Sequence, residues 1–264
     1  MKVFQVDAFT TKPFAGNPAG VCILSETIPD SDMLKIAKEL NLPETAFLHK
    51  NDSGYNLRWF TPKTEIELCG HATLAAAHIL WETGTLDQDD PANFDTLSGR
   101  LTANKNGTWI DLNFPAEYAK NVAAPVELTE ALGVAPKYVG KNRFDYLVEL
   151  ESEAEVRNLK PDFYLLKIVP CRGVIVTSKA DTEVYDFVSR FFAPAIGIDE
   201  DPVTGSSLCC LGPYWSQRLG KSELTAYQAS ARGGIIRVRG AEERIYLGGK
   251  AVTVLKGELF GLSA

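Results

Sequence analysis

The feature of this sequence that most constrains its fold is an internal repeat. Short motifs from the first half of the chain recur in the same order in the second half, 132 residues later before residue 69 and 135 residues later from there on. The matched pairs are Arg58–Pro62 with Arg190–Pro194, Cys69–His71 with Thr204–Ser206, Gly99–Leu101 with Gly234–Ile236, and Ile110–Leu112 with Ile245–Leu247. A shared order and a nearly constant offset indicate a duplicated unit rather than chance similarity.

Each half of the repeat contains one helix that is apolar on nearly every side. Residues 70–82 and 205–219 form these helices, each followed closely by a glycine that can end it. Such a helix belongs in the middle of a core with sheet around it. Strands are expected near residues 2–8, 20–24, 44–48, 55–60, 98–104, 108–113, 145–150, 171–177, 234–239, 243–248 and 250–255. The predicted fold class is α/β (α+β), with two pseudo-symmetric halves, each a curved mixed sheet rolled around a central apolar helix.

Two further helices and the lobe boundaries complete the predicted architecture. An amphipathic helix begins at Asp30 or Ser31 and stops before Pro43, and another, capped by Asp181 or Thr182, runs through Phe191. We place an N-terminal lobe at residues 1–116 and a C-terminal lobe at residues 117–250.

The composition is that of a folded, soluble protein. Its 264 residues are 45% hydrophobic, and 27 Lys and Arg against 34 Asp and Glu give a formal net charge of −7. This acidic balance disfavours nucleic acid and anionic membranes as partners, because both are bound by clustered Lys and Arg. No apolar run approaches the roughly 18 residues that cross a bilayer, and the five cysteines show no Cys-x-x-Cys spacing. We expect a cytoplasmic protein with reduced thiols, no membrane partner and no metal site.

The N-terminal ends of the two apolar helices are the expected binding site. Each helix begins at a glycine, Gly70 or Gly205, where unpaired backbone N–H groups and the helix dipole favour an anion. Two related lobes leave a cleft between them, and such clefts are preferred ligand sites. Because no complete dinucleotide or phosphate-loop motif accompanies these glycines, we predict a small carboxylate-bearing organic acid as the substrate.

Three polar residues near these helix ends are candidates for the chemistry. Glu44 opens an apolar strand, where partial burial would raise its pKa and suit it to take up and return a proton; the alternative is an exposed glutamate at a turn. His71 begins the first helix, whose dipole favours a neutral imidazole, or else it serves as a capping or core residue. Asp201 either serves the site or caps the second helix.

Cys69 offers a rival chemistry, because a thiol at a helix N-terminus can be activated as a base. Cofactor-independent racemases use two thiols, one on each face of the α-carbon. The repeat pairs Cys69 with Thr204, which cannot be the second thiol, and Cys209 and Cys210 are expected to be buried. An epimerase that uses Cys69 alone, or with a base that is not a thiol, remains open.

Motifs spread over nearly the whole chain resemble those of the phenazine-biosynthesis PhzF-like family of isomerases. They are Gln5–Phe9 with Phe14–Gly20, Glu44–Leu48, Cys69–Thr73, and Asp199–Ser206 with Gly212–Trp215. The resemblance implies a diaminopimelate epimerase-like fold with the active site between two α/β halves. It also implies that the last strand, residues 251–264, returns to the first half and that the protein is a homodimer.

The family's characterised chemistry is a cofactor-free isomerisation of a cyclic dihydroxy-anthranilate-type acid, in which a proton moves from one carbon to another. Matched residue by residue, the resemblance assigns Glu44 as the catalytic acid and base. It assigns His71, Asp201 and Ser206 as residues that position the substrate and relay protons. Relatives also occur in organisms that make no phenazines, so the resemblance does not name the substrate.

The substrate-binding residues implied by the resemblance lie at the two helix ends. Backbone amides of Gly70 and Gly205 would hold the carboxylate, and Thr73 and Ser207 are further candidates. Leu208 stands where many relatives have a histidine, a departure that bears on the polarity of the substrate. A non-catalytic protein that binds a small molecule on the same fold is the remaining alternative.

Overall fold

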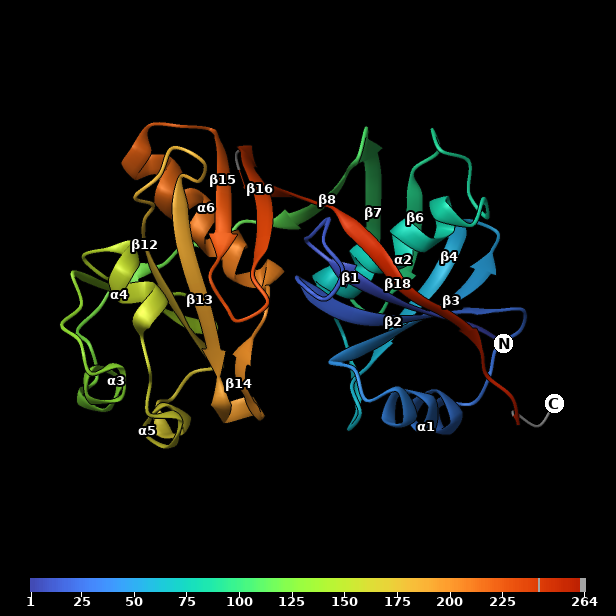
Figure 1. Cartoon of the computed structure of the whole chain (residues 1–264), viewed down its shortest axis with the longest axis horizontal. Coiled ribbons are helices and arrows are strands. Elements are labelled where there is room, and N and C mark those ends of the chain that lie inside the picture. The colour runs from blue at the N-terminus through green and yellow to red at the C-terminus, as the bar shows by residue number, and fades with distance from the viewer. Residues whose placement is uncertain (242, 262–264) are drawn as a thin grey trace. The chain divides into compact units, whose positions relative to one another are not determined.

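A computed structural model of the protein describes residues 1–241 and 243–261. The chain forms two compact units (Figure 1). Unit 1 comprises Met1–Asn113 together with the segment from Gly248 onward, and unit 2 comprises Phe114–Leu247. Among the residues described, no helix is long and apolar enough to cross a membrane.

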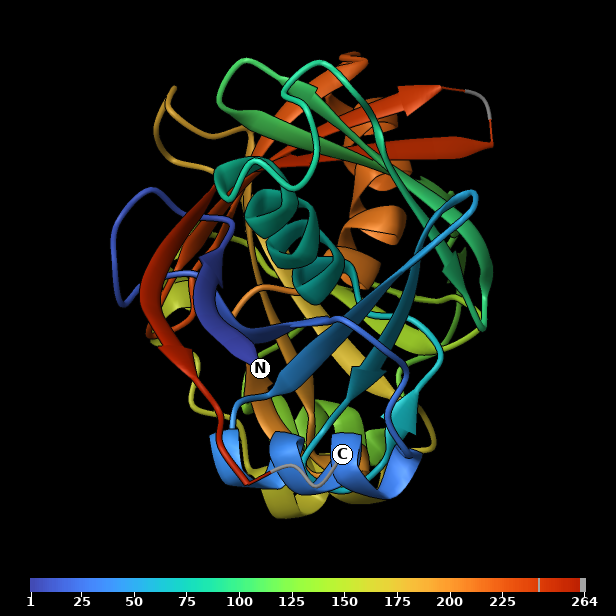
Figure 2. The same cartoon turned by 90° about the vertical axis from the view of Figure 1, so that its right-hand side faces the viewer.

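Unit 1 is a mixed sheet rolled around one helix. Its elements are β1 (Lys2–Ala8), β2 (Asn17–Leu24), α1 (Asp30–Leu40), β3 (Glu44–Asn51), β4 (Gly54–Phe60), β5 (Glu65–Ile66), α2 (Gly70–Glu82), β6 (Ala92–Thr96), β7 (Gly99–Asn106), β8 (Trp109–Pro115) and β18 (Ala251–Glu258). The strands pair in the order β18, β1, β2, β3, β4, β6, β7, β8. Helix α2 contacts β18 and β1 near one end of this order and β7 near the other, so the sheet curves around it (Figure 2).

The sequence of α2 explains its central place. Its run of alanines and leucines is buried on every face, from Ala72 through Leu80, with the partial exception of His78. A helix without a polar stripe gains by contacting apolar side chains all round. The sheet supplies them, because β2 is buried along nearly its whole length and β3 is buried from Glu44 through Leu48.

Unit 2 repeats this design. Its elements are β9 (Lys120–Asn121), α3 (Val126–Leu132), β10 (Tyr138–Lys141), β11 (Asp145–Glu149), α4 (Glu153–Asn158), α5 (Phe163–Ile168), β12 (Gly173–Lys179), β13 (Phe187–Ala193), the short 3₁₀ helix η1 (Pro194–Ile196), β14 (Ile198–Asp201), α6 (Gly205–Leu219), β15 (Glu223–Gln228), β16 (Gly234–Ala241) and β17 (Arg244–Gly249). The central helix is α6. Its Trp215 ring stacks on Phe187 of β13 at 5.8 Å, and its indole N–H donates to Thr177 Oγ1 of β12 at 3.0 Å.

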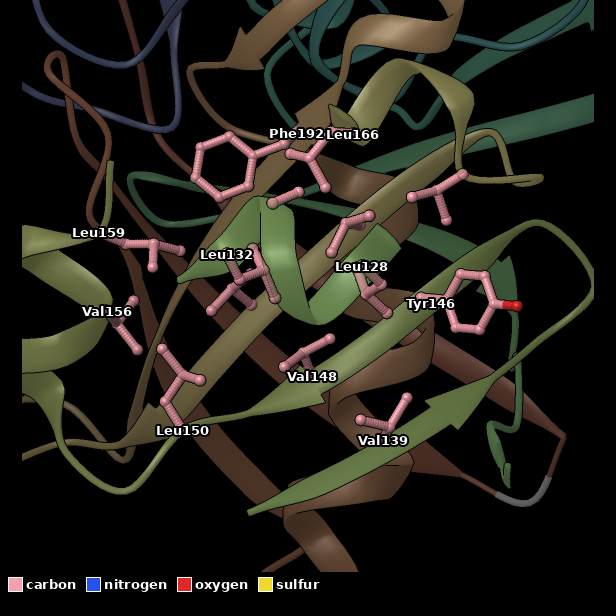
Figure 3. Packing of buried hydrophobic residues seen from close by; sticks show 14 of the residues in the cluster. Leu128, Leu132, Val139, Tyr146, Val148, Leu150, Val156, Leu159, Leu166 and Phe192 are labelled. Atoms are coloured by element: carbon pink, nitrogen blue, oxygen red, sulfur yellow. The ribbon is translucent and has the colours of Figure 1, made fainter. Parts of the chain in front are cut away.

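The other side of the unit 2 sheet is covered by short helices. Leu128 and Leu132 of α3 pack toward Val148 of β11, and Leu166 of α5 lies beside Phe192 of β13 (Figure 3). These side chains form one buried apolar cluster. It holds the sheet from the face opposite α6 and so fixes the strands that carry the polar residues described below.

The predicted duplication is visible in the strand pairing. In unit 1 the pairs from β1 to β7 run antiparallel, parallel, antiparallel, parallel and antiparallel. In unit 2 the pairs from β10 through β13 to β16 follow the same alternation. Equivalent ion pairs recur: Arg58 Nε lies 2.7 Å from Glu65, and Arg190 Nε lies 2.7 Å from Glu200. The predicted fold class is confirmed.

The helix predicted from residue 181 or 182 through Phe191 is wrong. Residues 181–186 form a loop, and Phe187–Ala193 is strand β13, buried on both faces. A strand covered on both faces is mostly apolar, as β13 is apart from Ser189 and Arg190, so its pattern lacks the alternation of a half-buried strand and resembles that of a buried helix. Helix α1 also differs in detail, because its N-cap is Pro29 and makes no side-chain capping bond.

Candidate active site

The structure brings Glu44 and His71 together inside unit 1. Glu44 is the first residue of β3 and His71 is the second residue of α2. Glu44 Oε2 lies 3.1 Å from His71 Nε2, and only 11% and 8% of the two side chains are exposed. Because β3 lies between β2 and β4, its first residue falls inside the sheet rather than at its edge. Glu44 is therefore buried and is not the exposed glutamate at a turn that was the alternative.

Two further side chains contact the other nitrogen of the His71 ring. Asn17 Nδ2 lies 3.3 Å from His71 Nδ1, and Cys69 Sγ lies 3.5 Å from it. Asn17 begins β2, which pairs in parallel with β3, and Cys69 is the N-cap of α2. Two buried groups therefore lie within reach of Nδ1, while Nε2 faces the Glu44 carboxylate at 3.1 Å.

Burial and charge oppose each other at this cluster. Burial alone lowers the pKa of His71, but the Cys69 sulfur and the Glu44 carboxylate outweigh it and raise the pKa well above 6.5. The neutral imidazole expected from the helix dipole is therefore disfavoured, because negative charge on the close neighbours Cys69 and Glu44 acts more strongly than partial charges at a helix end. Burial raises the pKa of the Cys69 thiol above its usual value, although the neighbouring His71 lowers it.

We expect the stability of the protein to depend on pH through His71. Because its folded-state pKa is raised, the folded protein binds this proton more tightly than the unfolded chain does. The resulting stabilisation is complete below the unfolded-state pKa of about 6.5 and is lost as the pH rises through the folded-state pKa. Urea unfolding across this range should show the decline, and His71→Gln should remove that part of it. An unchanged pH profile in His71→Gln would contradict the assignment.

Glu44, Cys69 and His71 also offer ligand atoms within 4.8 Å of one another, the spacing of a metal site. The arrangement does not suit one ion, because Glu44 faces Nε2 of the ring and Cys69 faces Nδ1. An ion bound to either nitrogen would have the ring between it and one of the other ligands.

In unit 2 the predicted residues Asp201 and Ser206 lie around the start of α6. Asp201 ends β14 and accepts a hydrogen bond from Thr204 Oγ1 at 2.5 Å, whereas Thr204 is the N-cap. Ser206 Oγ accepts from Arg172 Nη2 at 3.1 Å. The Arg172 guanidinium forms a bidentate pair with Asp145, which is 1% exposed. Ser206 therefore lies next to a fixed positive charge.

The predicted substrate-binding residues occupy the first turns of the two helices. Gly70 and Gly205 are the first residues of α2 and α6. The Thr73 hydroxyl donates to the Cys69 carbonyl at 2.6 Å, and the Ser207 hydroxyl donates to the Thr204 carbonyl at 2.8 Å. These two hydroxyls are thus engaged within their own helices, and a role in substrate binding stays a prediction.

The side chains that follow in α6 are buried. Leu208 is 0% exposed, so the position where many relatives have a histidine is part of the core of this protein. Cys209 and Cys210 are buried as predicted, and burial raises the pKa of each thiol to about 12. Neither is poised to act as a thiolate.

Sequence reasoning missed three residues of these clusters. Asn17 lies in the Phe14–Gly20 motif, but the motif did not single it out as a site residue. Asp145 and Arg172 are separated by 26 intervening positions and carry no motif. They meet because β11 and β12 pair in parallel, with Asp145 opposite Gly173. This pair could have been predicted only from the register of the two strands, which the sequence alone does not give.

Comparison with known structures first defines the class of fold. A probable proline racemase from Agrobacterium radiobacter, with bound carbonate, superimposes with a TM-score of 0.67 over 99% of this chain and 93% of its own, at 10% identity. This likeness concerns the fold alone. A PhzF-family phenazine biosynthesis protein from Enterococcus faecalis is much nearer, with a TM-score of 0.95 and 41% identity over 98% of both chains.

Sequence comparison then gives the family. A protein of Halalkalibacterium halodurans described as an uncharacterized isomerase is 54% identical over 258 residues, 97% of each chain. The family model for phenazine biosynthesis-like proteins matches residues 6–257. The chain belongs to this PhzC-PhzF family, as its motifs predicted.

Proposed function

We propose that this protein is an isomerase that moves a proton between two carbons of a small, carboxylate-bearing organic acid without a cofactor. One observation carries the proposal: a glutamate and a histidine, Glu44 and His71, lie 3.1 Å apart and are almost fully buried. Relatives described as isomerases support the reaction class.

The chemistry follows from the pair. The Glu44 carboxylate takes a proton from a carbon next to a carbonyl or enol system, and the electron pair of the broken C–H bond passes into that system. The protonated carboxyl then returns the proton to a second carbon on the same face, so no proton is gained or lost. His71, protonated beside it, stabilises the carboxylate before the first step and after the second.

We propose that the unit 2 residues bind the substrate rather than take the proton. Ser206 lies 3.1 Å from the Arg172 guanidinium, and Asp201 is bonded to Thr204. Gly70 and Gly205 begin α2 and α6, and the first N–H groups of a helix have no carbonyl partner within the helix, which suits them to an anion. Ser206→Ala should therefore raise KM more than it lowers kcat.

The proposal is tested by solvent exchange. Candidate cyclic and acyclic organic acids are incubated with the enzyme in D₂O, and deuterium at carbon is followed by NMR. We expect exchange together with migration of a C=C bond in at least one acid. A screen in which exchange occurs only at the α-carbon of amino acids would contradict it.

A second candidate is an epimerase-type enzyme that uses Cys69, and the 3.5 Å contact between Cys69 Sγ and His71 Nδ1 favours it. The raised pKa of the buried thiol opposes it. We expect Cys69→Ser to retain deuterium exchange within about threefold of the wild type, because the hydroxyl keeps a partner for Nδ1. Loss of α-carbon exchange in this variant would establish the epimerase instead.

A non-catalytic binding protein is the alternative outside enzymes. It would show ligand-dependent stabilisation in a thermal-shift screen with no exchange in D₂O for any ligand found. The buried Glu44–His71 pair argues against it, because a buried ion pair gives little net stability and needs another reason to persist.

A further inference from the structure

The inference concerns Asn17, which has no part in the chemistry described so far. Its side chain is 0% exposed, and Nδ2 lies 3.3 Å from His71 Nδ1. The preceding Gly16 has φ +66°, and a Cβ there would lie 2.1 Å from the Ala8 carbonyl oxygen. Only glycine permits this turn, so the loop between β1 and β2 is built to deliver Asn17 beside the ring.

A histidine that gains and loses a proton changes what it requires of the group beside Nδ1. In the neutral ring with its proton on Nε2, Nδ1 is an acceptor; in the imidazolium, Nδ1–H is a donor. A buried polar group left without a partner is destabilising, because it has lost its hydrogen bonds to water. A neighbour able only to donate, or only to accept, would therefore hold His71 in one state.

A carboxamide suits both states. It carries N–H donors on one side and a carbonyl acceptor on the other, and a half-turn about its last bond exchanges them. The other groups that face the ring within unit 1 are the Glu44 carboxylate at Nε2 and the Cys69 sulfur at Nδ1. The carboxylate favours the imidazolium, and the thiol is a weak partner. Among these groups, the amide is the one that offers a strong hydrogen bond to either form.

We propose that Asn17 is a positioning residue that lets His71 change its protonation state inside a buried site. Its amide N–H donates to Nδ1 of the neutral ring, and after a half-turn its carbonyl accepts from Nδ1–H of the imidazolium. The proposal rests on the proposed function in one respect, that Glu44 gains and loses a proton beside His71 during turnover, which changes how strongly the ring holds its own proton.

The test replaces Asn17 by aspartate, which has the same size but only accepts. In Asn17→Asp we expect ¹⁵N NMR to show both His71 nitrogens protonated to a higher pH than in the wild type. Asn56→Asp is the matched control: it places the same charge on an exposed residue of β4 that does not contact His71, and it should leave the titration unchanged.

A second measurement needs no variant. In the wild type, the side-chain ¹H and ¹⁵N signals of Asn17 should shift with the same midpoint pH as the ring nitrogens of His71. A folded Asn17→Asp whose His71 titrates as in Asn56→Asp, or Asn17 signals that stay constant through the titration, would overturn the proposal. If Asn17→Asp does not fold, the wild-type signals decide. These signals are measured without substrate. A failure of the proposed reaction can therefore be distinguished from a failure of the proposed role of Asn17.

Discussion

Glu44→Gln should reduce the proposed proton transfer by about 10²–10⁴-fold while leaving the protein folded, because glutamine keeps the shape of the side chain and cannot take a proton. The substituted side chain still lies beside His71 in a site where the two side chains are 11% and 8% exposed. Deuterium exchange into substrate, followed by NMR under single-turnover and steady-state conditions, measures the loss directly.

The effect on ligand binding separates chemistry from folding. Because Glu44 acts on a carbon and not on the carboxylate of the substrate, KM should change by less than about threefold. Glu39→Gln, an exposed glutamate on α1, serves as the matched control and should keep full activity. Wild-type exchange in Glu44→Gln would remove Glu44 from the mechanism.

Arg172→Met should destabilise unit 2 by about 3–5 kcal/mol, the range for removing one partner of a buried ion pair. The reason is Asp145, which is 1% exposed and loses the guanidinium that faces both of its oxygens. Burial already raises the pKa of Asp145 against the opposing effect of Arg172. The loss in the variant should therefore shrink as the pH falls and Asp145 becomes protonated. Urea unfolding, with tryptophan fluorescence as the signal, gives the free energy.

A compensating change tests the cause. The double variant Arg172→Met/Asp145→Asn removes the uncompensated charge and should recover most of the lost stability. Arg143→Met is the control, since its side chain is 67% exposed and its pair with Glu117 should contribute about 1 kcal/mol or less. If the double variant is as unstable as Arg172→Met alone, the burial of Asp145 is not the cause.

How far the sequence predicts this structure depends on the range of the interactions involved. The two central helices follow from their local apolar composition, and their glycines mark their ends. Strand β13 does not, because a doubly buried strand and a buried helix look alike locally. The repeat does indicate a strand at this position, because Arg190–Pro194 matches Arg58–Pro62, and most of Arg58–Pro62 lies in strand β4.

The candidate site likewise combines residues that local sequence identifies with contacts that only long-range packing determines. Glu44 and His71 were singled out by motif, yet their contact depends on β3 lying inside the sheet and on α2 filling its curve. Asn17 joins them through parallel pairing of β2 with β3, and Arg172 meets Asp145 through parallel pairing of β12 with β11. Parallel strands are joined by crossover connections, so their register is set by packing and cannot be predicted from any short segment of the sequence.

The pairing of β18 with β1 has a consequence for biosynthesis. Strand β1 (Lys2–Ala8) is synthesised long before its neighbour β18, which begins at Ala251. Until β18 has been made, the nascent chain carries β1 with one edge unpaired, and such edges invite association with other chains. A chain that stops before Ala251 should therefore aggregate through this exposed edge, whereas the chain that contains β18 covers it.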